Sequence, residues 1–248
     1  MLAVHGVNKC YKKGGWLSRD RQQVLHDVEF QCKRGECLGI IGESGSGKST
    51  LGRLLLGLEK PDRGRITFEG RSVLHRKVRK GALSAVFQDY TSSINPFYTV
   101  EEAIQESLKN ASSDKLAAYR RMDELLEMVG LDVSYRVKYP HELSGGEAQR
   151  VCIARAIASE PACIVLDEAL SSLDMPVQAG VLQLLKDIRR KHGMSYIFIT
   201  HDIEAAAFIC DRIMIVRHGR IVEIVEAERL KDVESDYAKE LLQKMMAL

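Results

Sequence analysis

The sequence of 248 residues lacks any apolar run that is long enough to cross a bilayer. Its most apolar stretches, 162–166 and 213–216, fall far short of the roughly 18–20 residues that a membrane-spanning helix needs. A secretory signal peptide is not expected either, because His5, Lys9 and Lys12 are followed by no long apolar segment. These absences predict a chain that neither spans a membrane nor carries an export signal.

A strong excess of charge is also missing. The chain has 36 lysine and arginine residues against 34 aspartate and glutamate residues, which leaves a formal net charge of +2. No basic field is present from which nucleic-acid binding could be argued. With 45% hydrophobic and 28% charged residues, no internal repeat and no low-complexity tract, the composition excludes a disordered or collagen-like chain.

Cysteine pairs with metal-binding spacing are absent as well, since no two cysteines form a Cys-x-x-Cys motif. Scattered cysteines, several of them in apolar and strand-like contexts, indicate reduced and buried thiols rather than a metal site or a disulfide framework. The six residues concerned are Cys10, Cys32, Cys37, Cys152, Cys163 and Cys210.

What the sequence does contain is an alternation of short apolar runs with longer helical patterns. The runs at 38–41, 163–166 and 196–200 have the composition of strands that are buried on both faces, and 49–58 has helical composition. This order predicts an α/β fold built on a parallel sheet. We further expect a hairpin with strands 213–216 and 221–225 around His218-Gly219, a helical insert over 98–130, an exposed loop over 12–23, and one or two amphipathic helices over 226–248.

A glycine-rich phosphate loop is the first chemical signal. Residues 42–49 match the G-x-x-x-x-G-K-[ST] pattern, and an expected strand and helix flank the loop as a true site requires. Its glycines turn backbone N–H groups toward phosphate oxygens, Lys48 places a positive charge at the β- and γ-phosphates, and Ser49 offers a hydroxyl to Mg²⁺. The predicted nucleotide-binding residues are Gly42, Glu43, Ser44, Gly45, Ser46, Gly47, Lys48, Ser49 and Thr50.

Two carboxylates follow the apolar run 163–166. Asp167 is expected at the C-terminal end of a buried strand, where open α/β sheets bind ligands, and it would hold Mg²⁺. Glu168 comes one residue later and can polarise the attacking water. His201 follows the expected strand at 196–200 and is placed to reach a γ-phosphate.

A second candidate anion site lies at 143–150, Leu-Ser-Gly-Gly-Glu-Ala-Gln-Arg. Ser144 and two glycines ahead of a helix offer open N–H groups and a hydroxyl. One nucleotide cannot easily use both loops of the same chain, whereas two chains arranged head to tail could each close the other's site. At this point the sequence resembles the nucleotide-binding domains of ABC transporters, whose signature is LSGGQ, and the resemblance covers residues 2–242.

The resemblance implies roles for residues that bind the nucleotide and its metal. Tyr11 resembles the aromatic residue that stacks on adenine. Gln88 resembles the Q-loop glutamine, which senses Mg²⁺ and couples to the membrane domain. Ser144, Gly145 and Gly146 resemble the signature residues that contact the partner's ATP.

It also implies the hydrolytic residues. Asp167 resembles the Walker B aspartate, Glu168 the catalytic glutamate, His201 the switch histidine, and 171–174 the D-loop. ATP and Mg²⁺ are the implied ligands. The implied catalytic set is Lys48, Gln88, Glu168 and His201, and the implied magnesium ligands are Ser49, Gln88 and Asp167.

Departures from the family pattern are mild. Glu147 replaces the glutamine of the signature, at a position expected to face away from phosphate, and Tyr90 replaces a common proline. No catalytic side chain is missing, so an active hydrolytic site is expected.

The implied fold is α/β: a RecA-like P-loop NTPase core with an ABC-type antiparallel β subdomain and an inserted helical subdomain. We assign the core to 1–88 and 161–230 within one ABC transporter domain over 1–230, the helical subdomain to 89–160, and a helical tail to 231–248.

Segments outside the catalytic motifs resemble one branch of the family. Residues 87–96, followed by Thr99-Val100, are similar to the FQDPxxSLNPxxTV segment of oligopeptide, dipeptide and nickel importers, and 235–242 is similar to their HPYTxxLL tail. Ala169-Leu170 stands where peptide importers commonly have Pro-Thr. Residues 11–16, 53–66 and 167–185 resemble the nickel-import branch. Nickel, or a related metal or metal chelate, is therefore the favoured cargo, and di- or oligopeptides are the alternative.

The resemblance implies an ATP-hydrolysing subunit of an importer that works peripherally on the cytoplasmic side of the cell membrane. Its implied partners are a second ABC ATPase subunit, two integral membrane permease subunits and, indirectly, an extracytoplasmic substrate-binding protein. The family implies a heterodimer of ATPases, although the residues leave a homodimer open. A soluble ABC ATPase acting on nucleic acid or ribosomes is disfavoured by the single phosphate loop, the short insert and the net charge, and segment 143–150 argues against a kinase or GTPase.

Overall fold

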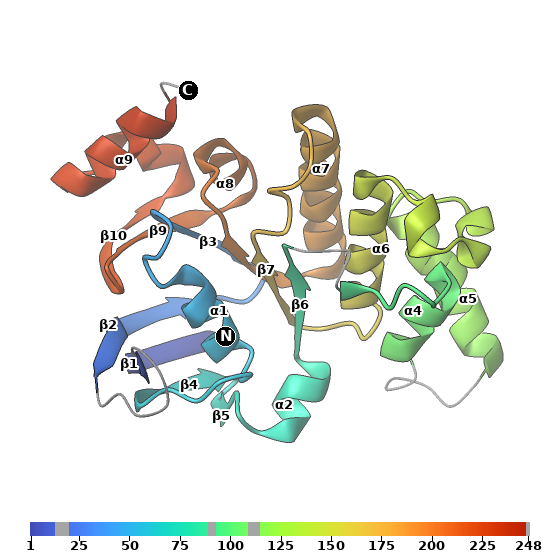
Figure 1. Cartoon of the computed structure of the whole chain (residues 1–248), viewed down its shortest axis with the longest axis horizontal. Helices are drawn as coiled ribbons and strands as arrows, with labels where there is room; N and C mark the ends of the chain where they lie inside the picture. Colours follow the sequence, from blue (N-terminus) through green and yellow to red (C-terminus); the bar gives the residue numbers. More distant parts are fainter. Residues whose placement is uncertain (13–19, 89–92, 109–114, 247–248) are drawn as a thin grey trace.

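The computed structural model describes residues 1–12, 20–88, 93–108 and 115–246, and two β-sheets with surrounding helices make up the fold (Figure 1). The expected α/β class is confirmed. One sheet is antiparallel and has the strand order β2-β1-β4-β5, and the other is mostly parallel with the order β10-β9-β3-β8-β7-β6. A group of helices, α4, α5 and α6, lies to one side of the larger sheet (Figure 1).

The antiparallel sheet is built from the N-terminal part of the chain. Its strands are β1 (Leu2–Lys12), β2 (Arg21–Cys32), β4 (Arg63–Phe68) and β5 (Arg71–Ser72). Val4, Leu25 and Phe30 on this sheet are buried in one cluster with Leu38 and Ile40 of the larger sheet. Burial of these apolar side chains between the two sheets stabilises their stacking.

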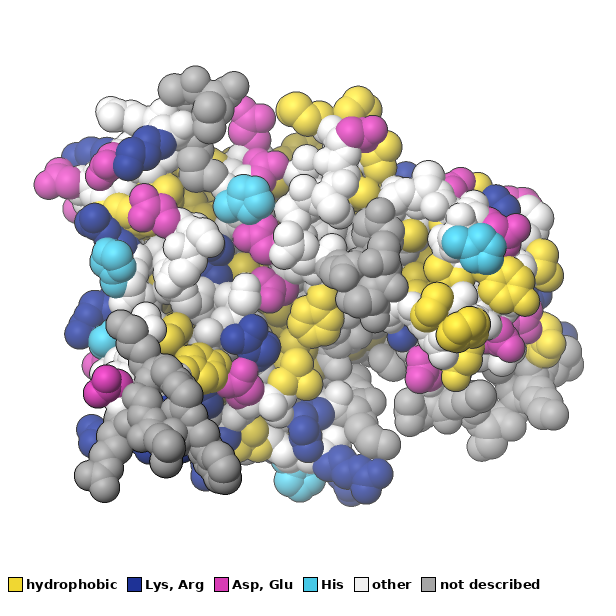
Figure 2. Space-filling view, viewed as in Figure 1, with side chains coloured by type: hydrophobic (Ala, Val, Ile, Leu, Met, Phe, Trp, Pro, Cys, Tyr) yellow, Lys and Arg dark blue, Asp and Glu magenta, His cyan; other side chains and the backbone are white. Residues whose placement is uncertain are grey.

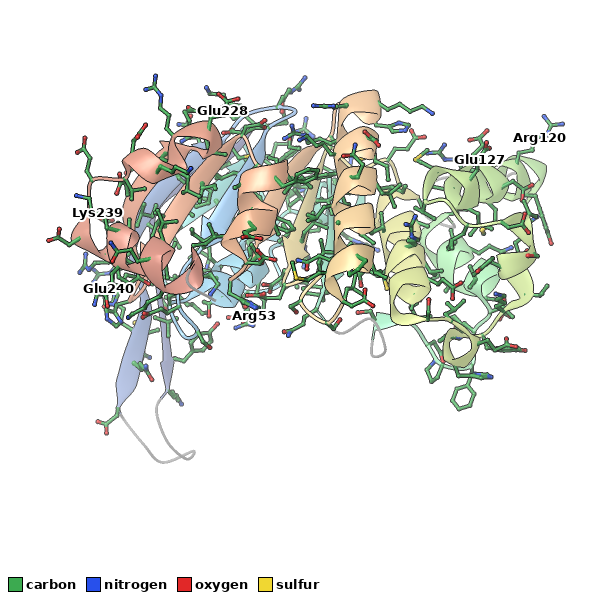
Figure 3. The ribbon with its side chains drawn as sticks, turned by 90° about the horizontal axis from the view of Figure 1, so that it is seen from above. Arg53, Arg120, Glu127, Glu228, Lys239 and Glu240 are labelled. Atoms are coloured by element: carbon green, nitrogen blue, oxygen red, sulfur yellow. The ribbon has the colours of Figure 1, made fainter. Side chains whose placement is uncertain are left out.

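The segment expected to be an exposed loop over 12–23 is exposed at both of its described ends, but Lys12 and residues 21–23 belong to strands and not to a loop. β1 continues to Lys12 and β2 begins at Arg21, and Tyr11 is paired with Gln22 across the hairpin. The polar side chains of this segment suggested a loop, but backbone pairing to a neighbouring strand satisfies the N–H and C=O groups whatever the side chains are. Residues 13–19 of the expected loop lie outside the described residues. Figure 3 shows the hairpin projecting from the body of the molecule.

The larger sheet contains the five strands that the sequence predicted, with small changes at their ends, and one strand, β6, that it did not predict. Every residue of β3, β7 and β8 is buried, in keeping with strands covered on both faces. β6, β7, β8, β3 and β9 run parallel, and β10 pairs antiparallel to β9 through the expected hairpin at His218-Gly219. The bounds are Cys37–Ile41 (β3), Leu83–Phe87 (β6), Cys163–Asp167 (β7), Ser195–Ile199 (β8), Arg212–Arg217 (β9) and Arg220–Glu226 (β10).

Helices are present in each region that the sequence predicted to be helical. The helix expected at 49–58 is α1, which is shorter and covers Lys48–Leu55. The region 98–130 contains α4 and α5, and residues 109–114 between them lie outside the described part. The remaining bounds are Arg76–Gly81 (α2), Val100–Leu108 (α4), Lys115–Met128 (α5), Gly145–Ile157 (α6), Met175–His192 (α7), Ile203–Ile209 (α8) and Asp236–Met246 (α9), with 3₁₀ turns at Val133–Val137, Pro140–Glu142 and Ala227–Asp232.

A second hydrophobic cluster joins the helical group to the larger sheet. Ile104 of α4, Met122 of α5 and Val151 of α6 are fully buried in it together with Leu166 of β7. This shared cluster holds α6, and the loop that precedes it, against the rest of the chain. Among the described residues, no helix is both long and apolar enough to serve as a membrane span.

Thiol accessibility gives a simple test of this packing. Cys10 is partly exposed, whereas the other five cysteines are buried, and burial raises the pKa of the Cys163 thiol to about 12. Because the thiolate is the reactive form, we expect a chromogenic disulfide reagent to modify one thiol quickly in the native chain and the other five only on unfolding. The Cys10→Ser variant should lose the fast phase; rapid reaction of several thiols in that variant would contradict the described core.

Candidate active site

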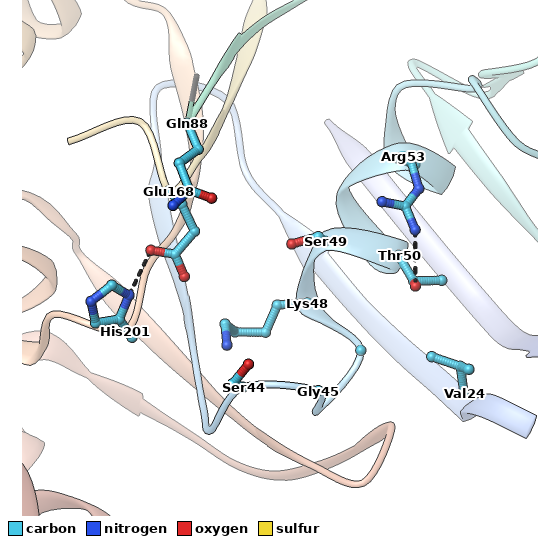
Figure 4. Close-up of a pocket in the computed structure, with 11 residues that line it drawn as sticks. Val24, Ser44, Gly45, Lys48, Ser49, Thr50, Arg53, Gln88, Glu168 and His201 are labelled. Atoms are coloured by element: carbon cyan, nitrogen blue, oxygen red, sulfur yellow. Dashed lines mark hydrogen bonds and ion pairs between the residues drawn. The ribbon is translucent and has the colours of Figure 1, made fainter. Parts of the chain in front are cut away.

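The ends of four parallel strands bring the predicted site residues to one edge of the larger sheet. Gly42 follows β3, Gln88 follows β6, Glu168 follows β7, and His201 lies two residues beyond β8. Parallel strands present their carboxyl ends at a common edge, which is where open α/β sheets bind ligands. Residues that are far apart in the sequence therefore meet around one space (Figure 4).

The phosphate loop joins β3 to α1 and depends on glycine at two positions. Gly42 has a φ of 155°, and a Cβ placed there would lie 2.2 Å from the Val216 carbonyl oxygen. Gly47, the N-cap of α1, has a φ of 102°, and a Cβ there would lie 2.8 Å from a Leu25 side-chain carbon. A larger residue at either position would distort the loop, so the glycines are needed for its shape.

Lys48 is buried at the start of α1 and is held by its own loop. Its Nζ donates hydrogen bonds to the carbonyl oxygens of Gly42, at 2.7 Å, and Glu43, at 3.1 Å. Burial lowers the pKa of Lys48, and the nearby carboxylates of Glu168 and Asp167 act in the opposite direction. The ammonium group is thus positioned above the loop, beside the space that an anion would fill.

Ser49 and Asp167 are in direct contact. The Ser49 hydroxyl donates to Asp167 Oδ1 at 3.2 Å. Burial raises the pKa of the Asp167 carboxyl, and the Ser49 hydrogen bond lowers it. A hard cation would stabilise the charge of this largely desolvated carboxylate. The carboxylate and the neighbouring hydroxyl also supply oxygen atoms, which are the preferred ligands of Mg²⁺. The residues present therefore fit the magnesium ion that the sequence implied.

Glu168 and His201 form a pair at the opposite wall of the site. His201 Nδ1 lies 2.7 Å from Glu168 Oε2 in a hydrogen bond that the carboxylate accepts (Figure 4). Glu168 has a φ of 51°, and its N–H donates to the Ile199 carbonyl at 2.9 Å, which anchors this backbone between β7 and β8. Its side chain is 14% exposed against 61% for His201, so the histidine orients a carboxylate that faces the cavity from a sheltered position.

A cavity of about 400 Å³ lies between these groups. Nine of the predicted residues line it, whereas Asp167, which is buried and bonded to Ser49, does not. Gly42, Glu43 and Ser46 belong to the loop but do not line the cavity, and the Ser46 hydroxyl is buried with no partner in the described structure. The predicted residues that line it are Ser44, Gly45, Gly47, Lys48, Ser49, Thr50, Gln88, Glu168 and His201.

Sequence reasoning missed two residues of the cavity wall, Val24 and Arg53. Val24 is on β2, immediately after the segment expected to be a loop, so its strand pairing hid it. Arg53 donates to Thr50 Oγ1 at 3.3 Å from the next turn of α1 (Figure 4). Its place four residues after Ser49 was a readable signal, since residues at this spacing share one face of a helix.

Tyr11 does not line the cavity. Its hydroxyl donates to Glu59 Oε2 at 2.5 Å, and the other carboxylate oxygen of Glu59 accepts from Arg53 Nε at 2.7 Å. Lys9 lies 3.2 Å from the same carboxylate. Tyr11 is therefore connected to the cavity wall through Glu59 and Arg53, and its contact with adenine stays a prediction.

Ser144, Gly145 and Gly146 lie at the start of α6, and none of them lines the cavity. Ser144 is exposed and caps the helix: its hydroxyl accepts from the Glu147 N–H at 3.4 Å, while the Glu147 carboxylate accepts from the Ser144 N–H at 2.7 Å. The same carboxylate also accepts from the Tyr135 hydroxyl. Glu147, the departure from the family signature, is thus engaged within its own helix turn.

Segments used to assign the branch are only partly described. Asp89 and Tyr90 lie outside the described residues, as do the two residues that follow them.

Of the expected D-loop at 171–174, Asp174 caps α7, and its carboxylate accepts from the Val177 N–H at 3.1 Å. Val177 also packs against Gly146, where an added Cβ would lie 2.4 Å from a Val177 methyl carbon. The start of α7 therefore packs against the signature loop of the same chain.

Comparisons with known proteins agree with this geometry. A family model described as "ABC transporter" matches residues 25–171. The metal-staphylopine import system ATP-binding protein CntF of Staphylococcus aureus (strain NCTC 8325 / PS 47) is 45% identical over 248 residues, which is 100% of both chains. The nickel import ATP-binding protein NikE of Escherichia coli (strain K12) is 42% identical over 230 residues, which is 90% of this chain and 86% of that protein.

Solved structures are similar over nearly the whole chain. The dimeric post-hydrolysis state of the ATP-binding cassette MJ0796, bound to ADP and Pi, has a TM-score of 0.81 at 30% identity and covers 92% of this chain and 99% of that chain. The cbiO1 protein of Clostridium perfringens, part of the ABC transporter complex cbiONQ, has a TM-score of 0.83 at 27% identity, with coverages of 98% and 93%.

Proposed function

The chain belongs to the ABC transporter family of ATP-binding proteins, and on that premise we propose that it is the ATP-hydrolysing subunit of a metal importer. The observation that carries the proposal is the convergence of Lys48, Glu168 and His201 on one cavity beside the Ser49–Asp167 pair. ATP is the substrate of the site. Nickel or a metal chelate is the proposed cargo, in line with the names of the NikE and CntF relatives.

In the proposed reaction, the phosphate loop binds the triphosphate through its backbone N–H groups and Lys48. Ser49, Asp167 and Gln88 would hold Mg²⁺, which when bound neutralises charge on the β- and γ-phosphates. Glu168 orients the attacking water and accepts its proton, and His201 holds the Glu168 carboxylate in place from the other side.

The signature residues point to a second ATPase. Ser144 is exposed and lies outside the cavity of its own chain, so it is available to another chain's nucleotide. We propose a head-to-tail dimer in which each chain supplies a phosphate loop to one site and a signature loop to the other. The MJ0796 structure is dimeric, and a partner of different sequence is our proposal for this protein.

The helical group provides a surface for the membrane subunits. Figure 2 shows hydrophobic side chains gathered over this part of the molecule. Phe97 and Val137 are 85% and 73% exposed, and the Val100 N–H donates to the Lys138 carbonyl at 2.9 Å, which joins the start of α4 to the end of the 3₁₀ turn Val133–Val137. We propose that two permease subunits dock on this surface, near Gln88, with the chain on the cytoplasmic side of the membrane and 89–160 acting as the helical subdomain.

Metal uptake in cells tests the proposal. Deletion of the gene should abolish high-affinity uptake of radioactive nickel, the wild-type gene should restore it, and the Glu168→Gln gene should not. The tagged chain should also copurify with integral membrane proteins. Unchanged nickel uptake, together with loss of growth on dipeptides as the nitrogen source, would replace the metal by peptides as the cargo. Copurification with RNA or DNA instead of membrane subunits would contradict an importer.

A further inference from the structure

The C-terminal helix α9 has no part in the proposed reaction, yet it lies against the phosphate loop. Its inner side is buried: Tyr237, Ala238 and Leu241 are 6%, 0% and 4% exposed. Lys239 and Glu240 lie on its outer side (Figure 3). These three side chains belong to the second hydrophobic cluster, which joins the helical group to the larger sheet, so α9 is an integral part of the core.

The start of α9 is fixed by hydrogen bonds from β10. The Glu223 carboxylate accepts from the N–H groups of Glu234, at 2.9 Å, and Ser235, at 3.1 Å. The Ser235 hydroxyl in turn accepts from the Ala238 N–H at 3.2 Å and caps the helix. These contacts leave the first turn of α9, which contains Tyr237, little freedom to move relative to the sheet.

Tyr237 reaches the phosphate loop directly. Its hydroxyl accepts a hydrogen bond from the Glu43 N–H at 3.4 Å. The guanidinium of Arg217, the last residue of β9, lies 4.4 Å from the centre of the Tyr237 ring. The ring is thus held on one side by a cation–π contact while its hydroxyl meets the loop backbone.

Residue Glu43 is where this contact meets the catalytic machinery. Its N–H is bound by Tyr237, and its carbonyl oxygen accepts from Lys48 Nζ at 3.1 Å. A second contact from the C-terminal part of the chain, the Gly219 N–H to the Ser46 carbonyl at 2.9 Å, holds the loop further along. Both contacts use groups on the loop that leave the cavity-lining residues Gly45 and Gly47 open to phosphate.

We propose that Tyr237 is a positioning residue for the phosphate loop, which holds the Glu43 peptide and through it the ammonium group of Lys48. The tail helix α9 thereby contributes to nucleotide affinity without touching the nucleotide. This inference rests on the ATP binding of the proposed function, and on no assumption about cargo or membrane partners.

The test is nucleotide binding by the full-length Tyr237→Phe variant. The substitution removes the hydroxyl and keeps the ring beneath Arg217, so the fold should be retained. Loss of one hydrogen bond to the loop should weaken MgADP and MgATP binding about two- to fivefold in titration calorimetry, with KM raised in proportion and kcat little changed. Tyr119→Phe is the matched control, because Tyr119 is an exposed tyrosine on α5 that does not line the cavity and whose ring also lies against an arginine, Arg136, at 4.9 Å.

The outcomes separate this inference from the proposed function. If the wild-type chain binds no nucleotide, the proposed function itself fails. If the wild type binds and Tyr237→Phe binds equally well, within about 1.5-fold, the positioning role is wrong. A fall in thermal stability with unchanged affinity at a temperature well below unfolding would show a purely structural role and would also overturn the inference.

Discussion

Replacement of Glu168 by Gln should abolish ATP hydrolysis and leave ATP binding intact. The amide keeps the shape of the side chain and can still bond to His201, which now lies 2.7 Å from the carboxylate. It cannot accept a proton from water, and general base catalysis contributes roughly a hundredfold or more to a rate, so hydrolysis should fall by at least that factor. In the proposed head-to-tail dimer ATP favours the closed state, so the variant should accumulate as an ATP-bound dimer.

Steady-state phosphate release and light scattering with MgATP measure the two parts of this result. Glu160→Gln is the matched control, since Glu160 also has a positive φ, of 49°, but lies far from the cavity with its side chain 71% exposed. The control should hydrolyse ATP at the wild-type rate. Hydrolysis at the wild-type rate by Glu168→Gln would show that Glu168 is not the general base. His201 would then be the next candidate for that role.

Local sequence patterns predicted the parts of the fold that depend on local chemistry. The phosphate loop could be recognised in the sequence because its residues meet backbone or charge requirements, as Gly42 and Lys48 illustrate. Strands that are buried on both faces are mostly apolar, which is why β3, β7 and β8 could be predicted from the sequence. The convergence of Glu168 and His201 followed from one rule, that parallel strands end at the same edge.

Contacts between distant segments could not be read in this way. The polar residues around Lys12 and Arg21 are strand residues only because they pair across a hairpin. Val24 lines the cavity only because this part of β2 packs beside Gly47 of the phosphate loop, and Tyr237 reaches Glu43 across 194 positions of sequence. Such contacts are set by tertiary packing, for which a single sequence carries no periodic signal.

The signature loop shows how a motif can be located and yet leave its action undetermined. The residues that cap α6 were identified from their glycines and hydroxyl, and the structure places them outside the cavity of the same chain. Ser144 and Glu147 satisfy each other's backbone N–H groups, so the loop is formed before any partner arrives. In the proposed dimer, a preformed loop lowers the entropy cost of closing the shared site.

Replacement of Lys48 by Met should remove most of the nucleotide affinity. Methionine keeps the length of the buried stem but loses the ammonium, which is held by the Gly42 and Glu43 carbonyls 2.7 and 3.1 Å away. A charge-assisted hydrogen bond to phosphate in a sheltered site is the strongest kind available here, so MgATP affinity should fall about 10- to 100-fold. Hydrolysis should fall further, because negative charge that develops on the phosphate oxygens would lose its cation.

Thermal unfolding with and without MgATP measures this loss, since a ligand that binds only the folded state raises Tm by mass action. The wild type should show a clear MgATP-dependent rise, Lys48→Met almost none, and the control Lys191→Met, at an exposed position in the last turn of α7, the full rise. Burial already lowers the pKa of Lys48, so removal of its charge relieves a desolvation cost in the unliganded chain. The nucleotide-free Tm of Lys48→Met should therefore stay close to that of the wild type, and an undiminished rise with MgATP would mean that the triphosphate does not bind at this loop.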